Sequence, residues 1–401
     1  MAGRGQALMV CATQEHTGKT SVSMALIAGL VRRFGPDRVG YMKPVGQKHV
    51  MVQGKDGEHI KARKSDQGTL PVDKDVAVAK EHFGLTAAYN AMSPLVLHKG
   101  YTKRFLDGEI DAWDQEKAIR EGFEELIQGN DFVVVEGTGH VGVGSVVGMN
   151  NADVARLLGL EVLLVGNGGV GSTYDTMVLN QNLCHAKGVR VCAVLLNKVK
   201  MGKGFMVRDY IGKALRRDSW GAPILGVVPW AESLDQPSTM DLEILFNTTA
   251  LAGRQHLLRR YSRFELVTTS LRRLLEKLGD GGINHTSTCF ITHATRNDII
   301  LGLLSHSQDT SAVAFDAGLI LTGTPPGNIP HSFVSDCISR SAIPVLSVGL
   351  STSEVVRKLE NFTSKMTVKD RVRTAQVIQH YEPEIDFDAL LSCASVPPPP
   401  R

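Results

Sequence analysis

Three residues near the N-terminus have the types and the order that bind a phosphate: Gly18, Lys19 and Thr20. They follow a short apolar run, residues 7–12, and open a segment whose apolar residues recur at helical spacing. A loop between a buried strand and a helix directs backbone N–H groups at one point, where an anion is stabilised. There the Lys19 ammonium would contact a β- or γ-phosphate, and the Thr20 hydroxyl would bind Mg²⁺.

The motif departs from the strict G-x-x-x-x-G-K-[ST] pattern at one position, because Thr13 stands where that pattern has glycine. The alternative is a chance Gly-Lys-Thr triplet at the start of a helix. A strand directly before the triplet and an amphipathic helix directly after it favour nucleotide binding.

Two further charged residues follow predicted strands. Lys43 comes after the strand at 38–42 and before Pro44, which cannot continue a central strand. Ligands bind at this carboxyl edge in open α/β sheets, although a surface lysine at a turn would have the same pattern. Glu136 follows the buried run at 131–135. An acid there suits Mg²⁺ in a P-loop protein, and a structural or capping acid is the alternative.

Four more residues have roles that remain open on the residues alone. Asp73 and Asp75 precede a predicted helix, where carboxylates either complement the helix dipole or hold a metal. Asn197 follows the strand at 189–196 and would either contact a nucleotide base or cap a turn. His140, in the glycine-rich run after Glu136, is as suited to a structural hydrogen bond as to a ligand.

The elements that would position these residues alternate between strand and helix from residue 7 to residue 228. This alternation predicts a parallel sheet with helices on both faces, with the polar stretch 47–71 as a loop or flap. The length of 401 residues favours two domains. The predicted divisions are a nucleotide-binding domain at 1–235, a helical linker at 236–284, a smaller α/β domain at 285–390 and a disordered proline-rich tail at 391–401.

Composition narrows the class of protein. Apolar residues make up 43% and charged residues 21%, which are globular values. The net charge of +3 gives no case for binding nucleic acid or a membrane surface. Six scattered cysteines without a C-x-x-C pair indicate reduced thiols. The stretch before the first strand is too short for a signal or transit peptide, so we expect a cytoplasmic protein.

The motifs also carry a family resemblance that covers most of the chain. The stretches ATQEHTGKTS, MKPVGQ, DKDVAVA, VVVEGTGH and LLNKV resemble, in that order, the dethiobiotin synthetase-like P-loop family. The stretches GYTKRFLDG, EGTGHVGVGSVVGMNNADVARLLG and GVVPW resemble the N-terminal region of long bacterial phosphotransacetylases. Residues 285–390 resemble the DRTGG domain that follows in those proteins. The stretch THATRNDIILGLL stands where that domain has its signature motif. The resemblance implies a P-loop NTPase-type fold followed by a DRTGG-like domain.

The resemblance also assigns roles to residues, with ATP and Mg²⁺ as cofactors. Lys19 and Lys43 would be catalytic, Lys43 by neutralising the anionic acceptor and the transferred phosphoryl group. The implied metal residues are Thr20, Asp75 and Glu136. The implied nucleotide-binding residues are Thr17, Gly18, Lys19, Thr20, Ser21 and, for adenine, Asn197. A small carboxylate substrate and a homodimer are the implied partners.

Two features depart from the family patterns. The acetyltransferase domain of the phosphotransacetylases and the glutaminase domain of related amidoligases have no counterpart in this sequence. The loop GTGHVGVGS also differs from the substrate loop of the synthetases. Two functions therefore stay open: ATP-dependent phosphorylation of a carboxylate or carbamate, or nucleotide sensing by a regulatory protein with little turnover.

Overall fold

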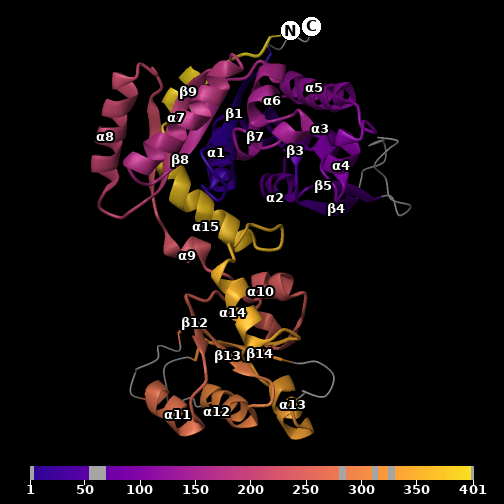
Figure 1. Cartoon of the computed structure of the whole chain (residues 1–401), viewed down its shortest axis with the longest axis vertical. Helices are drawn as coiled ribbons and strands as arrows, with labels where there is room; N and C mark the ends of the chain where they lie inside the picture. The colour runs from indigo at the N-terminus through magenta and orange to yellow at the C-terminus, as the bar shows by residue number, and fades with distance from the viewer. Residues whose placement is uncertain (1–3, 54–68, 280–285, 309–314, 324–329, 399–401) are drawn as a thin grey trace. The chain divides into compact units, whose positions relative to one another are not determined.

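The computed structural model describes residues 4–53, 69–279, 286–308, 315–323 and 330–398 (Figure 1). The chain forms two compact units. The first unit comprises residues Met1–Ala231 together with Met366–Arg401, and the second comprises Glu232–Lys365. Because the chain leaves the first unit and later returns to it, we call the second the inserted unit.

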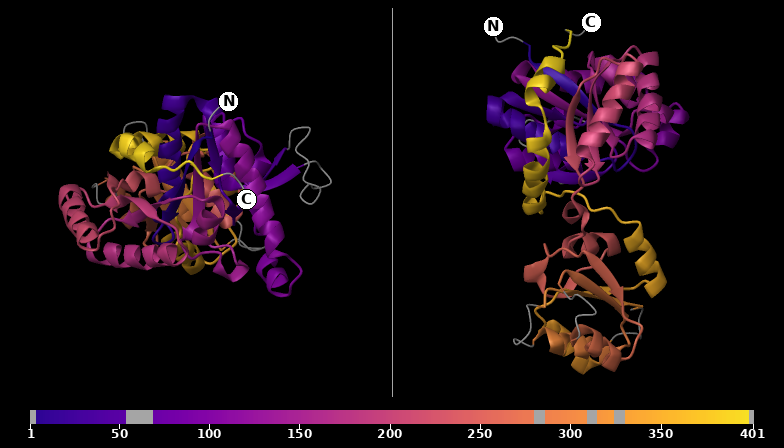
Figure 2. Two further views of the ribbon diagram at one scale, coloured as in Figure 1. Left: turned by 90° about the horizontal axis from the view of Figure 1, so that it is seen from above. Right: turned by 90° about the vertical axis from the view of Figure 1, so that its left-hand side faces the viewer.

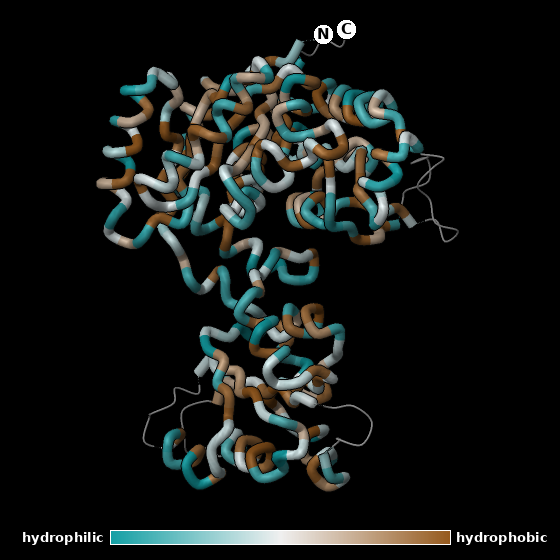
Figure 3. The backbone as a smooth tube through the Cα atoms, in the orientation of Figure 1, coloured by the Kyte–Doolittle hydropathy of each residue, from teal (hydrophilic) through white to brown (hydrophobic). Residues whose placement is uncertain are grey.

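A six-stranded parallel sheet forms the centre of the first unit. Its strands are β1 (Gln6–Ala12), β2 (Val39–Met42), β7 (Phe132–His140), β8 (Val162–Asn167), β9 (Val191–Val199) and β10 (Ile224–Pro229). Their order across the sheet is β10-β9-β8-β1-β7-β2. The strands are almost continuously apolar, as a sheet covered on both faces requires (Figure 3).

Helices cover both faces of this sheet. The helices are α1 (Lys19–Phe34), α2 (Lys74–Phe83), α3 (Tyr89–Met92), α4 (Tyr101–Leu106), α5 (Ala112–Gly129), α6 (Asn151–Leu158), α7 (Gly171–Ala186), α8 (Gly204–Arg217), α15 (Arg371–Tyr381) and α16 (Phe387–Cys393). Crossovers between parallel strands are right-handed. Helix α1 crosses toward β2, whereas α7 and α8 cross toward β10, so α1 lies on the face opposite α7 and α8.

Two short sheets complete the first unit. Strand β3 (Val45–Gly46) pairs in parallel with β6 (Leu95–Val96), and β4 (His49–Gln53) pairs with β5 (Thr69–Asp73) in an antiparallel hairpin. Parts of the predicted flap at 47–71 are therefore strands, and its central residues 54–68 lie outside the described residues.

The C-terminal segment, residues 366–398, covers the α1 face of the sheet beside β9 and β10. Helix α15 packs on α1, and α16 contacts β9 and β10. The Phe387 ring packs so closely on Gly29 of α1 that a Cβ there would lie 2.0 Å from the ring. The backbone N–H of Ala7 donates to the carbonyl of Ser395 (2.9 Å). Figure 2 shows these yellow helices and the pink α7 and α8 on opposite sides of the sheet.

The inserted unit is a smaller three-layer α/β structure. Its strands are β11 (Ala250–Ala252), β12 (Arg263–Leu266), β13 (Thr288–His293), β14 (Gly318–Thr322) and β15 (Val345–Val348). They are ordered β11-β15-β14-β13-β12, with only β11 antiparallel to its neighbour. Its helices are α9 (Glu232–Asp235), α10 (Thr239–Phe246), α11 (Leu271–Gly279), α12 (Asn297–Ser307), α13 (Ser332–Ser339) and α14 (Thr352–Glu360).

Two apolar clusters divide these helices between the faces of the sheet. One cluster joins the strands to α11, α12 and α13, and the other joins them to α10 and α14. The two α/β units, the larger with a parallel sheet between helices, confirm the predicted fold class. Within the described residues, no helix combines the length and the apolar content needed to cross a membrane.

The predicted divisions differ from the observed ones. Residues 236–284 are not a helical linker, because β11 and β12 lie within them and join the sheet of the inserted unit. The apolar residues of this stretch suggested helices. Strand β11, however, pairs with β15, which is far along the chain, and a local sequence pattern does not reveal such a pairing.

The C-terminal boundary also differs. Residues 366–390 belong to the first unit and not to a DRTGG-like domain. Residues 391–398 are not a free tail, since α16 extends to Cys393 and Arg4 donates to the carbonyl of Pro398 (3.0 Å). Residues 399–401 lie outside the described residues.

Candidate nucleotide and metal site

The loop between β1 and α1 has the geometry of an anion site. Gly18 precedes α1 with φ +95° and offers no capping side chain, so the first N–H groups of the helix face the loop. A Cβ at Gly18 would lie 2.3 Å from the amide nitrogen of Asn197, so only glycine fits. The buried Thr17 hydroxyl donates to the carbonyl of Gln14 (2.8 Å) and closes the loop.

Thr13 occupies the position of the missing glycine without backbone strain. It is not among the residues with positive φ, and its N–H donates to the carbonyl of Val165 (3.0 Å). Its own carbonyl accepts from the Asn180 amide (2.9 Å). The loop therefore keeps its shape although the sequence departs from the strict motif.

The three predicted metal residues converge. Thr20 lies in the first turn of α1, Asp75 in the first turn of α2, and Glu136 in β7. The Thr20 hydroxyl lies 2.9 Å from Glu136 Oε1 and 3.4 Å from Asp75 Oδ2. The register of the sheet explains the meeting, because Glu136 pairs with Val10 on β1, just before the loop.

Lys43 lies among the same carboxylates. Its ammonium contacts Asp75 and lies 3.2 Å from Glu136 Oε1 and 3.5 Å from Asp73 Oδ1. Burial by itself would lower the pKa of Lys43, but the surrounding carboxylates outweigh it and raise that pKa well above its ordinary value. Lys43 therefore lies at the strand end predicted from the sequence, where it is a buried cation and not a surface lysine.

The two aspartates have different roles. Asp73 caps α2 by accepting from the N–H of Asp75 (2.9 Å), which is the helix-start role. Asp75 instead faces Thr20 and Lys43, and Lys74 donates to its other oxygen (2.7 Å). Burial raises the pKa of Asp73, whereas Lys43 and Lys74 overcome the same burial effect at Asp75 and hold the pKa of Asp75 below its ordinary range.

Lys19 points toward β7 in this structure. Its ammonium donates to the carbonyl of Gly139 (2.5 Å), and burial lowers the pKa of Lys19. The helix start, Lys19 and Lys43 together place positive charge on one side of the site, and Asp75 and Glu136 supply the opposing carboxylates. Such a set can hold a polyphosphate together with a hard cation.

The remaining predicted residues have structural contacts. The Asn197 side chain is fully buried, donates to the carbonyl of Thr17 (2.7 Å) and accepts from the N–H of Lys198 (2.8 Å). It therefore ties β9 to the loop. Ser21 lies half-buried in the first turn of α1. His140 accepts from the N–H of Gly142 (3.2 Å), a local turn contact.

One residue of the cluster escaped the sequence patterns. Tyr41, in the apolar run of β2, donates its hydroxyl to Glu136 Oε2 (2.8 Å). Burial, followed by the nearby carboxylates, raises the pKa of Tyr41 well above its ordinary value and keeps it a donor. The sequence did contain a signal for this contact: a tyrosine within a buried strand needs a hydrogen-bond partner for its hydroxyl.

A magnesium ion fits this donor set. Across the described part of the chain, no three His, Cys, Asp or Glu side chains are arranged as a metal site. Mg²⁺, however, commonly takes one or two carboxylates and completes its coordination with water and substrate phosphate. Asp75, Glu136 and the Thr20 hydroxyl would supply such oxygens.

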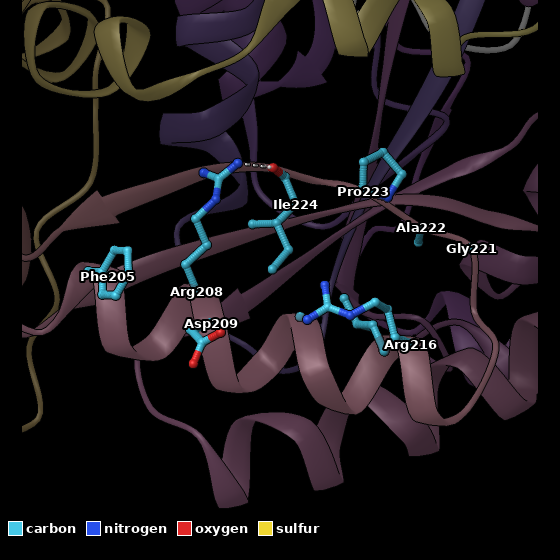
Figure 4. Close-up of a pocket in the computed structure, with 10 residues that line it drawn as sticks. Phe205, Arg208, Asp209, Arg216, Gly221, Ala222, Pro223 and Ile224 are labelled. Carbon is cyan, nitrogen blue, oxygen red and sulfur yellow. Dashed lines mark hydrogen bonds between the residues drawn. The ribbon is translucent and has the colours of Figure 1, made fainter.

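A hollow elsewhere on the first unit is separate from this site. It lies between α8 and the start of β10, and its lining includes Phe205, Arg208 and Pro223 (Figure 4). Arg208 donates to the carbonyl of Ile224 there (3.0 Å). Its lining includes none of Thr20, Lys43, Asp75 and Glu136, so it is not part of the cluster described above.

The sequence of this chain is similar to those of several known proteins. The model of a family described as AAA domain (AAA_26) matches residues 6–238. A phosphate acetyltransferase of Pseudomonas putida is 24% identical over 389 residues, covering 95% of this chain and 51% of its own length. An ATP-dependent dethiobiotin synthetase of Methanococcus vannielii is 27% identical over 195 residues, covering 47% of this chain and 78% of its own length.

A second ATP-dependent dethiobiotin synthetase, from Saccharopolyspora erythraea, is 26% identical over 247 residues, covering 62% of this chain and 97% of its own length. The chain spans about half the length of the phosphate acetyltransferase that it matches. These similarities confirm the resemblance to the synthetase-like and phosphotransacetylase-like proteins. Since the AAA domain model covers more than half of the chain and includes the loop at Gly18, the protein belongs to this P-loop family.

Proposed function

We propose that the protein binds Mg-ATP at the carboxyl edge of β1, β7 and β2 and transfers the γ-phosphoryl group to a carboxylate or carbamate. The observation that carries the proposal is the meeting of the Thr20, Asp75 and Glu136 oxygens with the Lys43 ammonium, beside the N-terminus of α1. Four separate segments of the chain supply these groups: α1, the turn after β2, α2 and β7. The names of the dethiobiotin synthetase relatives, which include ATP dependence, support the choice of nucleotide.

Each residue has a defined part in this proposal. The N–H groups at the start of α1 and the Lys19 ammonium bind the phosphates. Thr20, Asp75 and Glu136 hold Mg²⁺, which when bound neutralises charge on the β- and γ-phosphates. Lys43 neutralises the incoming anionic acceptor, and its raised pKa keeps it a cation. Phosphoryl transfer needs positioning and charge neutralisation above all, which these groups provide.

A second candidate is a nucleotide sensor with little turnover. The observation that favours it is the path of the chain around the inserted unit. The C-terminal segment begins at Met366, whose carbonyl accepts from Lys74 (3.5 Å), and Lys74 also donates to Asp75 (2.7 Å). The inserted unit is therefore joined in sequence to Met366, which contacts Lys74, the partner of the proposed metal residue Asp75. In this case the chain, which matches about half of a phosphate acetyltransferase, would bind a nucleotide and transmit that binding to another domain or protein.

The first test is the stability of the first unit with and without Mg-ATP. Trp113, Trp220 and Trp230 all lie in this unit, so tryptophan fluorescence during urea unfolding reports on it selectively. At about 100 times its Kd, a bound ligand adds roughly 2.7 kcal/mol to the free energy of unfolding. We expect that gain in the wild type and its loss in Lys19→Ala. Equal stability of the wild type with and without Mg-ATP would contradict the site.

The second test separates the enzyme from the sensor. ADP formation from Mg-ATP is measured across a panel of small carboxylates and amines with bicarbonate, because phosphoryl transfer to any acceptor leaves ADP. We expect one class to accelerate turnover, and Lys43→Met to abolish that acceleration while still binding Mg-ATP. Binding without acceleration by any acceptor would favour the sensor. Acceleration that is unchanged in Lys43→Met would refute the proposed mechanism.

A further inference from the structure

The C-terminal segment reaches the phosphate loop itself. Tyr381 is the last residue of α15, and a Cβ at Gly18 would lie 3.5 Å from its hydroxyl oxygen. The preceding residue, His380, is hydrogen-bonded through Nε2 to the carbonyl of Pro229 at the end of β10 (2.8 Å). Two consecutive side chains thus join the loop after β1 to the end of β10.

The order of the strands gives the bound nucleotide a direction. The proposed metal and phosphate groups lie on one side of β1, where Glu136 is on β7 and Lys43 follows β2. The terminal phosphates must lie beside these groups. The remainder of a nucleotide held in this way would extend from the loop toward the other side of β1, which would place its sugar and base toward the carboxyl ends of β9 and β10.

On this side of β1, the C-terminal segment covers the α1 face of strands β9 and β10. Helices α7 and α8 lie on the opposite face of the sheet, and η4 (Glu382–Glu384) and α16 pack against β10. Tyr381 is 6% exposed, and Asn197, which contacts the same glycine, is fully buried. The aromatic side chain of Tyr381 therefore stands at the border between the phosphate loop and the region of the sugar and base.

We propose that Tyr381 forms the nucleoside-side wall of the nucleotide site and makes the protein prefer a nucleotide to a bare polyphosphate. The inference rests on the proposed Mg-ATP site. It goes beyond that site because the residue comes from the far end of the chain, after the inserted unit. An aromatic side chain beside a base or sugar discriminates by contact with the nucleoside, whereas the helix N-terminus and the lysines recognise phosphate alone.

The test compares two ligands by calorimetry with the full chain: Mg-ATP and Mg-tripolyphosphate. Contact between a base and an aromatic side chain is worth roughly 5- to 150-fold in affinity. We expect Tyr381→Ala to raise the Kd for Mg-ATP at least about fivefold and to leave the Kd for Mg-tripolyphosphate within about twofold. Tyr381→Phe, which keeps the ring, should lose less than Tyr381→Ala.

The matched control is Val377→Ala. Val377 is buried one helical turn before Tyr381 on α15, and its loss weakens the packing of the helix without removing the aromatic wall. We expect it to leave the ratio of the two Kd values unchanged. The proposal is overturned if Tyr381→Ala changes both affinities equally, changes neither, tightens Mg-ATP binding, or matches Val377→Ala. A wild type that binds neither ligand would instead refute the proposed Mg-ATP site.

Discussion

Replacing Lys43 with methionine removes one positive charge from the centre of three buried carboxylates. The Lys43 ammonium contacts Asp75 and lies 3.2 Å from Glu136 and 3.5 Å from Asp73, and its side chain is 9% exposed. Breaking a buried ion pair by removing one partner costs about 3–5 kcal/mol, because the other charge stays buried without compensation. We expect Lys43→Met to lower the free energy of unfolding of the first unit by about that amount at pH 7.

The dependence on pH has a defined sign. In the wild type the pKa of Asp75 lies below its ordinary value, so this group stabilises the fold at neutral pH and loses that effect as the pH falls. Lys43 lowers the pKa values of Asp73 and Asp75, so the folded-state pKa values of these two groups should rise when Lys43 is removed. Their protonation at lower pH then removes buried negative charge from the variant and recovers part of its stability. The stability gap between wild type and Lys43→Met should therefore narrow when the pH is lowered from 7 to 4.5.

The assay is urea unfolding followed by tryptophan fluorescence, which reports on the first unit. Lys213→Met is the control, because Lys213 forms an exposed pair with Asp209 (2.7 Å), and exposed ion pairs contribute little to stability. Mg²⁺ without nucleotide should restore part of the stability of Lys43→Met, since the cation replaces the lost charge among the oxygens. A loss below about 1 kcal/mol, or a gap that does not change with pH, would refute the electrostatic reasoning.

Three further substitutions test other parts of the structure. Gly18→Ala places a side chain at a residue with φ +95°, and its Cβ would lie 2.3 Å from the amide nitrogen of Asn197. Calorimetry should therefore detect no binding of Mg-tripolyphosphate to this variant. The control Gly129→Ala, where the added Cβ meets open space, should bind it normally. Glu136→Gln removes a charged oxygen ligand, and a Mg²⁺ titration at fixed ATP should show a Kd raised by about tenfold or more; an unchanged Kd would exclude Glu136 from the metal site. Phe387→Ala removes the ring that packs on Gly29 and under Arg33 (4.3 Å), and urea unfolding should show a loss of about 3–5 kcal/mol, against almost none for the exposed Phe205→Ala.

Much of the first unit could be predicted from the sequence because its information is local. A continuous apolar run marks each central strand, and the residue that follows a parallel strand lies at the ligand edge. Lys19, Lys43 and Glu136 were found in this way, from motif and position. The sequence also predicted the α/β nature of the inserted unit from its alternating strands and helices.

The parts that could not be predicted depend on contacts between distant residues. The roles of Asp73 and Asp75 separate only when Thr20 and Lys43 are placed beside one of them. Tyr41 meets Glu136 only after β2 and β7 pair. Helix α15 carries apolar residues at helical spacing, but its pattern does not state which sheet it covers, so its assignment to the second domain was wrong.

The return of the chain to the first unit has a consequence for its synthesis. Helices α15 and α16 leave the ribosome only after the whole inserted unit, Glu232–Lys365, which at ordinary translation rates takes on the order of ten seconds. During that interval β9 and β10 lack the helices that cover their α1 face. A fragment that ends at residue 365 would keep this face exposed and should aggregate. A shortened protein that joins residue 231 to residue 366 through a flexible linker would contain every covering helix, and it is the fragment to prepare for study of the nucleotide site alone.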